Sequence, residues 1–214
     1  MTTTDDARLD AAGALRDLIH VFVAHDHDEA ALRDLAVFAR RESDAMRQGP
    51  RRDRLARMQA ARAASGSDSG FPGMQSGSGF EDRAVGGTAN PTAIDFELRY
   101  EDDEVVVDAV LHRAFEGAPG RAHGGMVAAL FDDVTGFVIA RHSEPAFTGQ
   151  LTVRFLAGVP VEEHVTVRAR LDSRERRKLF ITADMHAGDT VIATCQAIYI
   201  TVDPSIFAGA PDPR

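Results

Sequence analysis

The sequence predicts an α+β fold in which an antiparallel β-sheet wraps around one long helix, with a helical region in front of it. Three observations lead to this prediction. Apolar residues before position 64 recur at helical spacing, period-two runs rich in β-formers fill the chain from Ile94 onward, and one long helix interrupts those runs after His123. Strands that surround a single helix in this way are typical of a sheet packed on that helix.

Residues 1–64 form the predicted N-terminal helical extension. Two helices are expected there, because their apolar residues follow the i, i+3, i+4, i+7 pattern of a buried face. The first set is Leu15, Leu18, Ile19 and Phe22, and the second is Leu32, Leu35, Ala36 and Ala39. Between them, His25-Asp26-His27-Asp28 lacks the residues that would complete a metallohydrolase motif, so we interpret it as a polar turn and expect no metal site.

A basic stripe follows in an otherwise acidic chain. We interpret it as a solvated face that pairs with acidic groups of the same protein, and a docking surface for an anionic partner is the alternative. Its members are Arg40, Arg41, Arg47, Arg51, Arg52, Arg54, Arg57 and Arg62.

The middle of the chain changes composition. Residues 65–92 are rich in glycine and serine and are predicted to be a flexible linker. The domain that carries the chemistry is placed at 93–207, with a flexible tail at 208–214. Its strands are expected at 96–100, 105–111, 150–156, 161–171, 179–186 and 191–202.

A glycine-punctuated loop that leads into the long helix carries the main chemical signal. The loop runs from Phe115 and ends in His123-Gly124-Gly125. Two glycines at a helix start allow a ligand oxygen to approach backbone N–H groups, where the helix dipole favours negative charge. The sequence therefore predicts an oxyanion site at Gly124 and Gly125, with His123 making a loop-ordering hydrogen bond or acting as an acid.

The helix itself has two distinct faces. One is an apolar stripe that is expected to pack on the sheet, and the other is made of small residues around a single carboxylate, Asp132. An acid on such a face is a candidate general base or nucleophile. The stripe consists of Val127, Leu130, Phe131, Val134 and Val138, and the small face of Gly125, Ala128, Ala129 and Gly136.

The spacing of these groups predicts a site shared by two chains. His123 and Asp132 are separated by about 13 Å along the helix at ~1.5 Å per residue. A base and oxyanion donors that far apart cannot serve one carbonyl. Two antiparallel copies of the helix, packed along their small faces, would bring the start of one beside Asp132 of the other.

These residues resemble the motif of hotdog-fold acyl-CoA thioesterases, in particular the PaaI type and the thioesterase-superfamily-member branch with a helical N-terminal extension. The resemblance covers roughly residues 90–203 and implies the hotdog fold. It implies that Asp132 is the catalytic carboxylate and that Thr148 positions the attacking group. It also implies that Arg177 and Lys178, in a basic turn, lie near the phosphates of coenzyme A, with Gly117 and Gly120 in the substrate-binding loop.

The function that the resemblance implies is hydrolysis of acyl-CoA to a free acid and coenzyme A by a homodimer or a dimer of dimers. No cofactor is expected, because a thioester is already activated and needs only a nucleophile and an oxyanion site. One alternative is a non-catalytic hotdog module that binds acyl-CoA or another protein. A hydratase or dehydratase is disfavoured, because no histidine follows Asn90-Pro91 at the required spacing.

Composition further limits the classes of molecule that the protein is expected to bind. A net charge of −9 disfavours nucleic acid and anionic membrane surfaces. No apolar run approaches the ~18 residues of a membrane span, and the polar start lacks a signal-peptide core. The single cysteine, Cys195, suits a reducing cytoplasm and is expected to be a buried structural thiol rather than a nucleophile.

Overall fold

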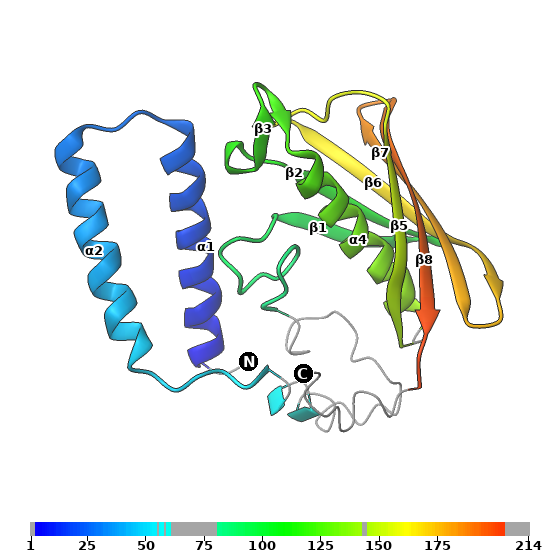
Figure 1. The fold of residues 1–214 in the computed structure, drawn as a ribbon, viewed down its shortest axis with the longest axis horizontal. Helices are drawn as coiled ribbons and strands as arrows, with labels where there is room; N and C mark the ends of the chain where they lie inside the picture. Colours follow the sequence, from blue (N-terminus) through cyan, green and yellow to red (C-terminus); the bar gives the residue numbers. More distant parts are fainter. Residues whose placement is uncertain (1–2, 55, 58, 61–80, 143–144, 204–214) are drawn as a thin grey trace.

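The computed structural model describes residues 3–54, 56–57, 59–60, 81–142 and 145–203. It contains the expected antiparallel sheet wrapped around one helix, with a helical hairpin beside it (Figure 1). The sheet has six strands in the order β1-β2-β6-β7-β8-β5. These are β1 (Phe96–Glu101), β2 (Glu104–Val110), β5 (Ala146–Phe155), β6 (His164–Glu175), β7 (Lys178–Ala187) and β8 (Thr190–Thr201).

The central helix α4 (Gly124–Arg141) lies across one face of the sheet (Figure 1). The whole predicted apolar stripe of this helix is buried, and it packs against inward-facing residues of β2, β6, β7 and β8. Strands β6, β7 and β8 largely alternate buried and partly exposed residues, as a sheet with one covered face does, whereas β2 buries Val105, Val106 and Val107 in succession. The pattern read from the sequence is thus confirmed for the core. A short turn η1 (Arg113–Phe115) and a small hairpin, β3 (Glu116–Ala118) with β4 (Arg121–Ala122), precede α4.

Strand β5 begins at Ala146, four residues before the expected start, and is an edge strand that pairs with β8. Its register slips between Thr148 and Gln150, which marks a β-bulge at Gly149. A regular strand would turn Thr148 and Leu151 to opposite faces, because side chains alternate. With the extra residue, Thr148 and Leu151 both face α4.

Residues 81–92 depart from the flexible linker that composition predicts. They form consecutive turns in which Ala89 N–H donates to Glu81 O at 2.7 Å and Ile94 N–H donates to Val85 O at 2.7 Å. Ala89, Ala93 and Ile94 are buried. Val85, in the same turns, packs against the hydrophobic core. The predicted linker residues 65–80 and the tail 208–214 lie outside the described residues.

The N-terminal region is a hairpin of α1 (Thr3–Ala24) and α2 (Glu29–Arg47), with α1 next to the sheet domain and α2 outside it (Figure 1). Asp28 caps α2 by accepting a hydrogen bond from Ala31 N–H at 2.9 Å. From α1, the buried Arg16 donates to Asp95 Oδ1 at 2.6 Å and to the carbonyl of Asn90 at 3.0 Å. The described helices include none that is long and apolar enough to cross a membrane.

Candidate active site

Asp132 and Thr148 form the polar centre of a surface pocket. The hydroxyl of Thr148 donates to Asp132 Oδ1 at 2.9 Å, and it reaches that atom because the bulge turns Thr148 toward α4. The Asp132 side chain is exposed in the single chain, so a ligand or water molecule has access to it. A carboxylate oriented by a hydroxyl, next to open space, is the arrangement that a general base or a nucleophile requires.

Tyr199 lies beneath this pair and fixes the backbone that carries it. Its phenol donates to the carbonyl of Asp132 at 3.0 Å and lies 3.0 Å from the hydroxyl of Thr135. Burial raises the pKa of Tyr199 to about 12, so the phenol stays protonated and able to donate. Tyr199 could not be predicted as a site residue, because a tyrosine in a strand carries no positional signal by itself.

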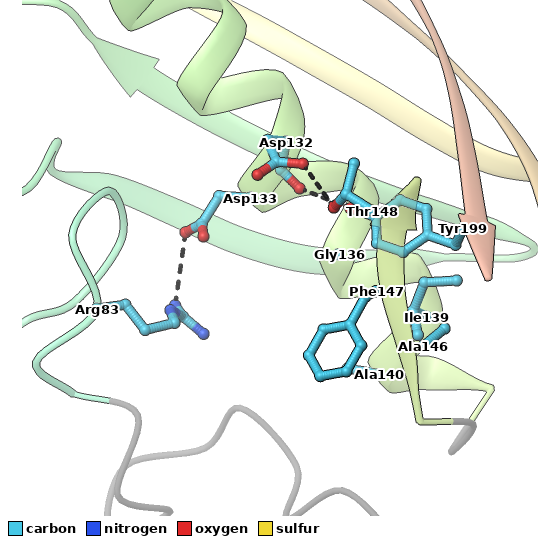
Figure 2. A pocket seen from close by; sticks show the side chains of 10 residues that line it. All are labelled: Arg83, Asp132, Asp133, Gly136, Ile139, Ala140, Ala146, Phe147, Thr148 and Tyr199. Carbon is cyan, nitrogen blue, oxygen red and sulfur yellow. Dashed lines mark hydrogen bonds and ion pairs between the residues drawn. The ribbon is translucent and has the colours of Figure 1, made fainter. Parts of the chain in front are cut away.

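The pocket beside Asp132 has a volume of about 190 Å³ and a mostly apolar wall (Figure 2). Its wall comes from the second half of α4 and the start of β5, where Phe147 is half exposed. Such a wall suits the apolar part of an organic ligand and leaves the reacting atoms at the polar end. The lining residues are Arg83, Asp132, Asp133, Gly136, Ile139, Ala140, Ala146, Phe147, Thr148 and Tyr199.

The start of α4 is the second candidate centre. His123 is the N-cap, and its Nδ1 accepts the N–H of Gly125 at 3.0 Å. The N–H of Gly125, one of the two predicted oxyanion donors, is therefore already hydrogen-bonded to His123. This corrects the prediction that Gly125 is an open oxyanion donor. Gly124, the first helical residue, has no acceptor for its N–H within the helix and none among the described contacts. The available donor is thus the N–H of Gly124.

The glycines of the preceding loop have structural reasons to be glycine. Gly120 has a φ of +72°, which a side chain would strain, and the carboxylate of Glu116 accepts its N–H. At Gly117, a Cβ would come within 2.9 Å of the Cα of His123. These two glycines shape the loop that delivers His123 and Gly124 to the start of α4, and their predicted contact with coenzyme A remains a prediction.

A second hollow, of about 360 Å³, adjoins Gly124. The ring of Phe155, at the end of β5, lies against Gly124. A Cβ added at Gly124 would lie 3.3 Å from that ring. Phe155 is half exposed, so it presents an apolar surface next to the free N–H. The hollow is lined by Ala122, Gly124, Phe155, Leu156, Ala157, Gly158 and Val159.

The structure does not bring all the predicted site residues together within one chain. Gly124 and Asp132 are eight helical residues apart, or about 12 Å. Arg177 lies at the Asp132 end of the sheet, where its Nε donates to the carbonyl of Thr201 at 3.0 Å, and Lys178 begins β7 beside it. Gly117 and Gly120 lie at the Gly124 end. One chain therefore holds the predicted site residues in two groups, at opposite ends of α4.

Cys195 is buried in β8, as expected of a structural thiol. Burial raises its pKa to about 12, and the neighbouring charge of Asp132 acts in the same direction. A thiol with so high a pKa is almost fully protonated at neutral pH and is therefore a poor nucleophile.

Arg83 and Asp133 are pocket residues that sequence analysis missed. Arg83 lies in the segment predicted to be a linker, and no role was predicted for Asp133 from the sequence. The two side chains form an ion pair, with Arg83 Nη2 3.7 Å from Asp133 Oδ2. An arginine inside a glycine-rich stretch gives no signal of burial, because its position depends on how the turns of that stretch fold.

Comparison with known proteins places this geometry in a family. Residues 119–194 match the family model described as the thioesterase superfamily. The chain is 34% identical to acyl-coenzyme A thioesterase THEM5 of Homo sapiens over 87 residues. This matched segment covers 40% of this chain and 35% of that protein. The chain is also 32% identical over 91 residues to acyl-coenzyme A thioesterase THEM4 of Mus musculus, covering 42% of this chain and 39% of that protein. The chain therefore matches well under half the length of these relatives.

The fold has a counterpart among solved structures. The crystal structure of a thioesterase superfamily protein matches this one with a TM-score of 0.71 at 22% identity, covering 90% of this chain and 94% of that one. That coverage is broad enough to include the N-terminal helices as well as the sheet and α4. The fold is therefore the hotdog fold, and residues 119–194 are similar to the thioesterase superfamily.

Proposed function

We propose that this protein hydrolyses acyl-CoA thioesters to a free acid and coenzyme A. The observation that carries the proposal is the hydrogen bond from Thr148 to Asp132 at the polar end of an apolar pocket. A thioester places an apolar acyl group next to a reactive carbonyl, and this pocket offers an apolar wall next to an oriented carboxylate. The names of the relatives THEM5 and THEM4, acyl-coenzyme A thioesterases, support the same reaction.

In the proposed reaction, Asp132 either removes a proton from a water molecule that attacks the carbonyl carbon or attacks that carbon directly. Direct attack gives a mixed anhydride that water then hydrolyses. In both routes the carbonyl oxygen becomes an oxyanion, for which a preorganised backbone N–H is a strong stabiliser. The C–S bond then breaks, and coenzyme A leaves as a thiolate, which takes up a proton. We assign the oxyanion contact to Gly124.

The proposal requires a two-fold dimer, because Asp132 and Gly124 of one chain are too far apart to share a carbonyl. The two groups of residues, one around Asp132 and one around Gly124, define where the two-fold axis of this dimer should lie. Midway between Gly124 and Asp132 on α4 is Ala128, a small residue that permits close helix contact. Midway between Thr148, next to Asp132, and Phe155, next to Gly124, are positions 151 and 152 of β5.

These two midpoints are compatible with one axis. Strand β5 is at the edge of the sheet, so its outer backbone groups are available for a partner strand. If two β5 strands pair antiparallel around positions 151 and 152, Phe155 of each comes opposite the bulge next to Thr148 of the other. The α4 helices then cross near Ala128, and each Asp132 faces the Gly124 N–H of the partner. The same composite site would then bring together Arg177 and Lys178 of one chain with Gly117 and Gly120 of the other.

The test is a screen of purified protein for thiol release. Short, medium, long and aryl acyl-CoAs are incubated with the protein, and free coenzyme A is measured with a thiol reagent. Saturable release from at least one class supports the proposal. If no class is hydrolysed while acyl-CoA binds with measurable affinity, the protein is a binding module, which is the alternative that the sequence left open.

A further inference from the structure

The turns of residues 81–94 bring a guanidinium into the pocket of Asp132. Arg83 lines that pocket, and its side chain is only 15% exposed. It pairs with Asp133 and lies over the ring of Phe137 at 5.1 Å from the ring centre. Figure 2 shows Asp132 and Asp133, adjacent in sequence, pointing to different partners: Asp132 toward Thr148 and Asp133 toward Arg83.

The position of Arg83 is fixed by contacts on both sides of it. Its Nη2 donates to the carbonyl of Gly86 at 3.1 Å, and the amide of Asn90 donates to the carbonyl of Arg83 at 3.0 Å. A side chain at Gly86 would collide with Asp133 Oδ2 and the ring of Phe96, so the backbone there can lie close to Asp133 only because it carries no Cβ. Arg83 is therefore held against Asp133.

Asp133 depends on this neighbour because its surroundings favour the protonated form. Burial raises the pKa of Asp133, and the charge of Asp132 raises it further, while Arg83 and a backbone hydrogen bond from Gly86 act in the opposite direction. Among the described residues, Arg54 and Glu81 also act on Arg83, and Tyr199 of β8 lies within electrostatic range of Asp133. Within the part of the chain that the structure describes, Arg83 is the cation that forms an ion pair with Asp133.

We propose that Arg83 is a positioning residue for the hydrolytic carboxylate. Its guanidinium holds the Asp133 side chain away from the substrate and balances its charge, which leaves Asp132 as the one carboxylate that faces the substrate. Without Arg83, two neighbouring carboxylates would compete for protons at the reaction centre. This inference rests on the proposed function, since it assigns Arg83 a role in the same site.

The test is a charge cycle at the pair, made in the full chain. The variants are Arg83→Gln, Asp133→Asn, the double variant with both changes, and Arg83→Lys as the charge-conserving control. Each is compared with the wild type by two measurements. One is the ¹³C carboxyl titration of the Asp132–Asp133 pair by NMR, and the other is the acid limb of the pH profile of kcat/KM for thioester hydrolysis.

The expected shifts have opposite signs. Loss of the positive charge in Arg83→Gln makes protonation easier and moves both midpoints to higher pH, by about 0.5 unit or more. Loss of the negative charge in Asp133→Asn moves them to lower pH. In the double variant both midpoints return close to the wild-type values, because the pair is removed as a neutral unit. In Arg83→Lys both midpoints also stay close to the wild-type values.

The inference is overturned if neither midpoint moves in the single variants while only the melting temperature falls, because Arg83 then has only a structural role. The double variant and Arg83→Lys leave no uncompensated charge at the position of the Arg83–Asp133 pair, so they are expected to fold even if a single variant does not. A clear shift of either midpoint in these two variants would also overturn the inference. Absence of hydrolysis by the wild type refutes the proposed function instead, and the NMR titration still decides whether Arg83 controls the proton affinity of the carboxylates.

Discussion

Thr148 is held 2.9 Å from Asp132 by a β-bulge rather than by a regular strand. The extra residue, Gly149, packs so closely on β8 that a Cβ there would lie 2.9 Å from Ile200. The bulge therefore has two roles: it turns the Thr148 hydroxyl toward α4, and it lets the strand continue against β8 after the turn.

Replacement of Thr148 by valine keeps the shape of the side chain but removes the hydroxyl donor. We expect kcat to fall by about 10-fold or more, because a hydrogen bond to a charged group contributes roughly 1.5–3 kcal/mol. Thr148→Ser keeps the donor and should retain most of the activity. Steady-state kinetics with the best acyl-CoA of the screen provides the measurement, and equal losses in the two variants would contradict a role for the hydroxyl.

Replacement of Asp132 by asparagine removes the proposed base or nucleophile with little change in size. Turnover should fall by on the order of 10²-fold or more, while size-exclusion chromatography and circular dichroism show the same oligomeric state and fold as the wild type. Asp103→Asn, in the exposed turn between β1 and β2, is the control that should leave turnover unchanged. Full activity in Asp132→Asn would rule out the assignment.

The oxyanion contact can be tested at a single backbone atom. Gly124→Pro deletes the N–H at the first helical position, where proline is otherwise well tolerated. Gly124→Ala keeps the N–H and brings a similar Cβ toward Phe155, so it controls for the steric effect. We expect a loss of about 10²- to 10³-fold in kcat for proline and a much smaller loss for alanine. Similar losses in both would indicate that packing on Phe155, rather than the N–H, matters.

Mixed dimers test whether the donor and the carboxylate come from different chains. Gly124→Pro and Asp132→Asn should each be inactive alone. After subunit exchange, the heterodimer has one composite site with both groups intact and should regain about half of the wild-type activity per dimer. Exchange is verified with differently tagged chains by native mass spectrometry. Verified exchange without recovery would place the whole site within one chain.

The core was predictable from the sequence because its signals are local. The apolar stripe of α4 and the alternation of β7 and β8 follow from periodicity, and each is buried as expected. Gly124 and Gly125 marked the start of α4, and the small residues around Asp132 marked its exposed side. These features depend on neighbours within a few residues along the chain.

The parts that could not be predicted depend on contacts between distant segments. Thr148 is assigned to the site only through the resemblance to the family motif. Period-two alternation would have turned it away from α4, and only the pairing of β5 with β8 reveals the bulge that reverses this. The composition of residues 81–92 resembles a linker, yet Ala89 and Arg83 are fixed by packing against the sheet domain. His123 was expected to order the loop, but its use of the Gly125 N–H follows from cap geometry.

Removal of the helical extension tests how far it supports the site. Arg16 of α1 donates to Asp95 and to the carbonyls of Thr88 and Asn90, so α1 fastens the same turns that carry Arg83. A chain that begins at Ser78 should still form a folded oligomer and hydrolyse acyl-CoA measurably, because Asp132, Thr148 and Gly124 lie in the sheet domain.

We expect a lower melting temperature in that truncated protein and an altered acyl-chain preference, since the pocket wall near Arg83 loses its outer support. Arg16→Gln in the full chain is the matched control, and it should reproduce part of both effects while α1 and α2 remain present. The measurements are thermal unfolding and kcat/KM across the acyl-CoA panel. A truncated protein that is soluble and dimeric but wholly inactive would show that the extension contributes directly to the site, and the division of the chain into an appendage and an enzyme would then be wrong.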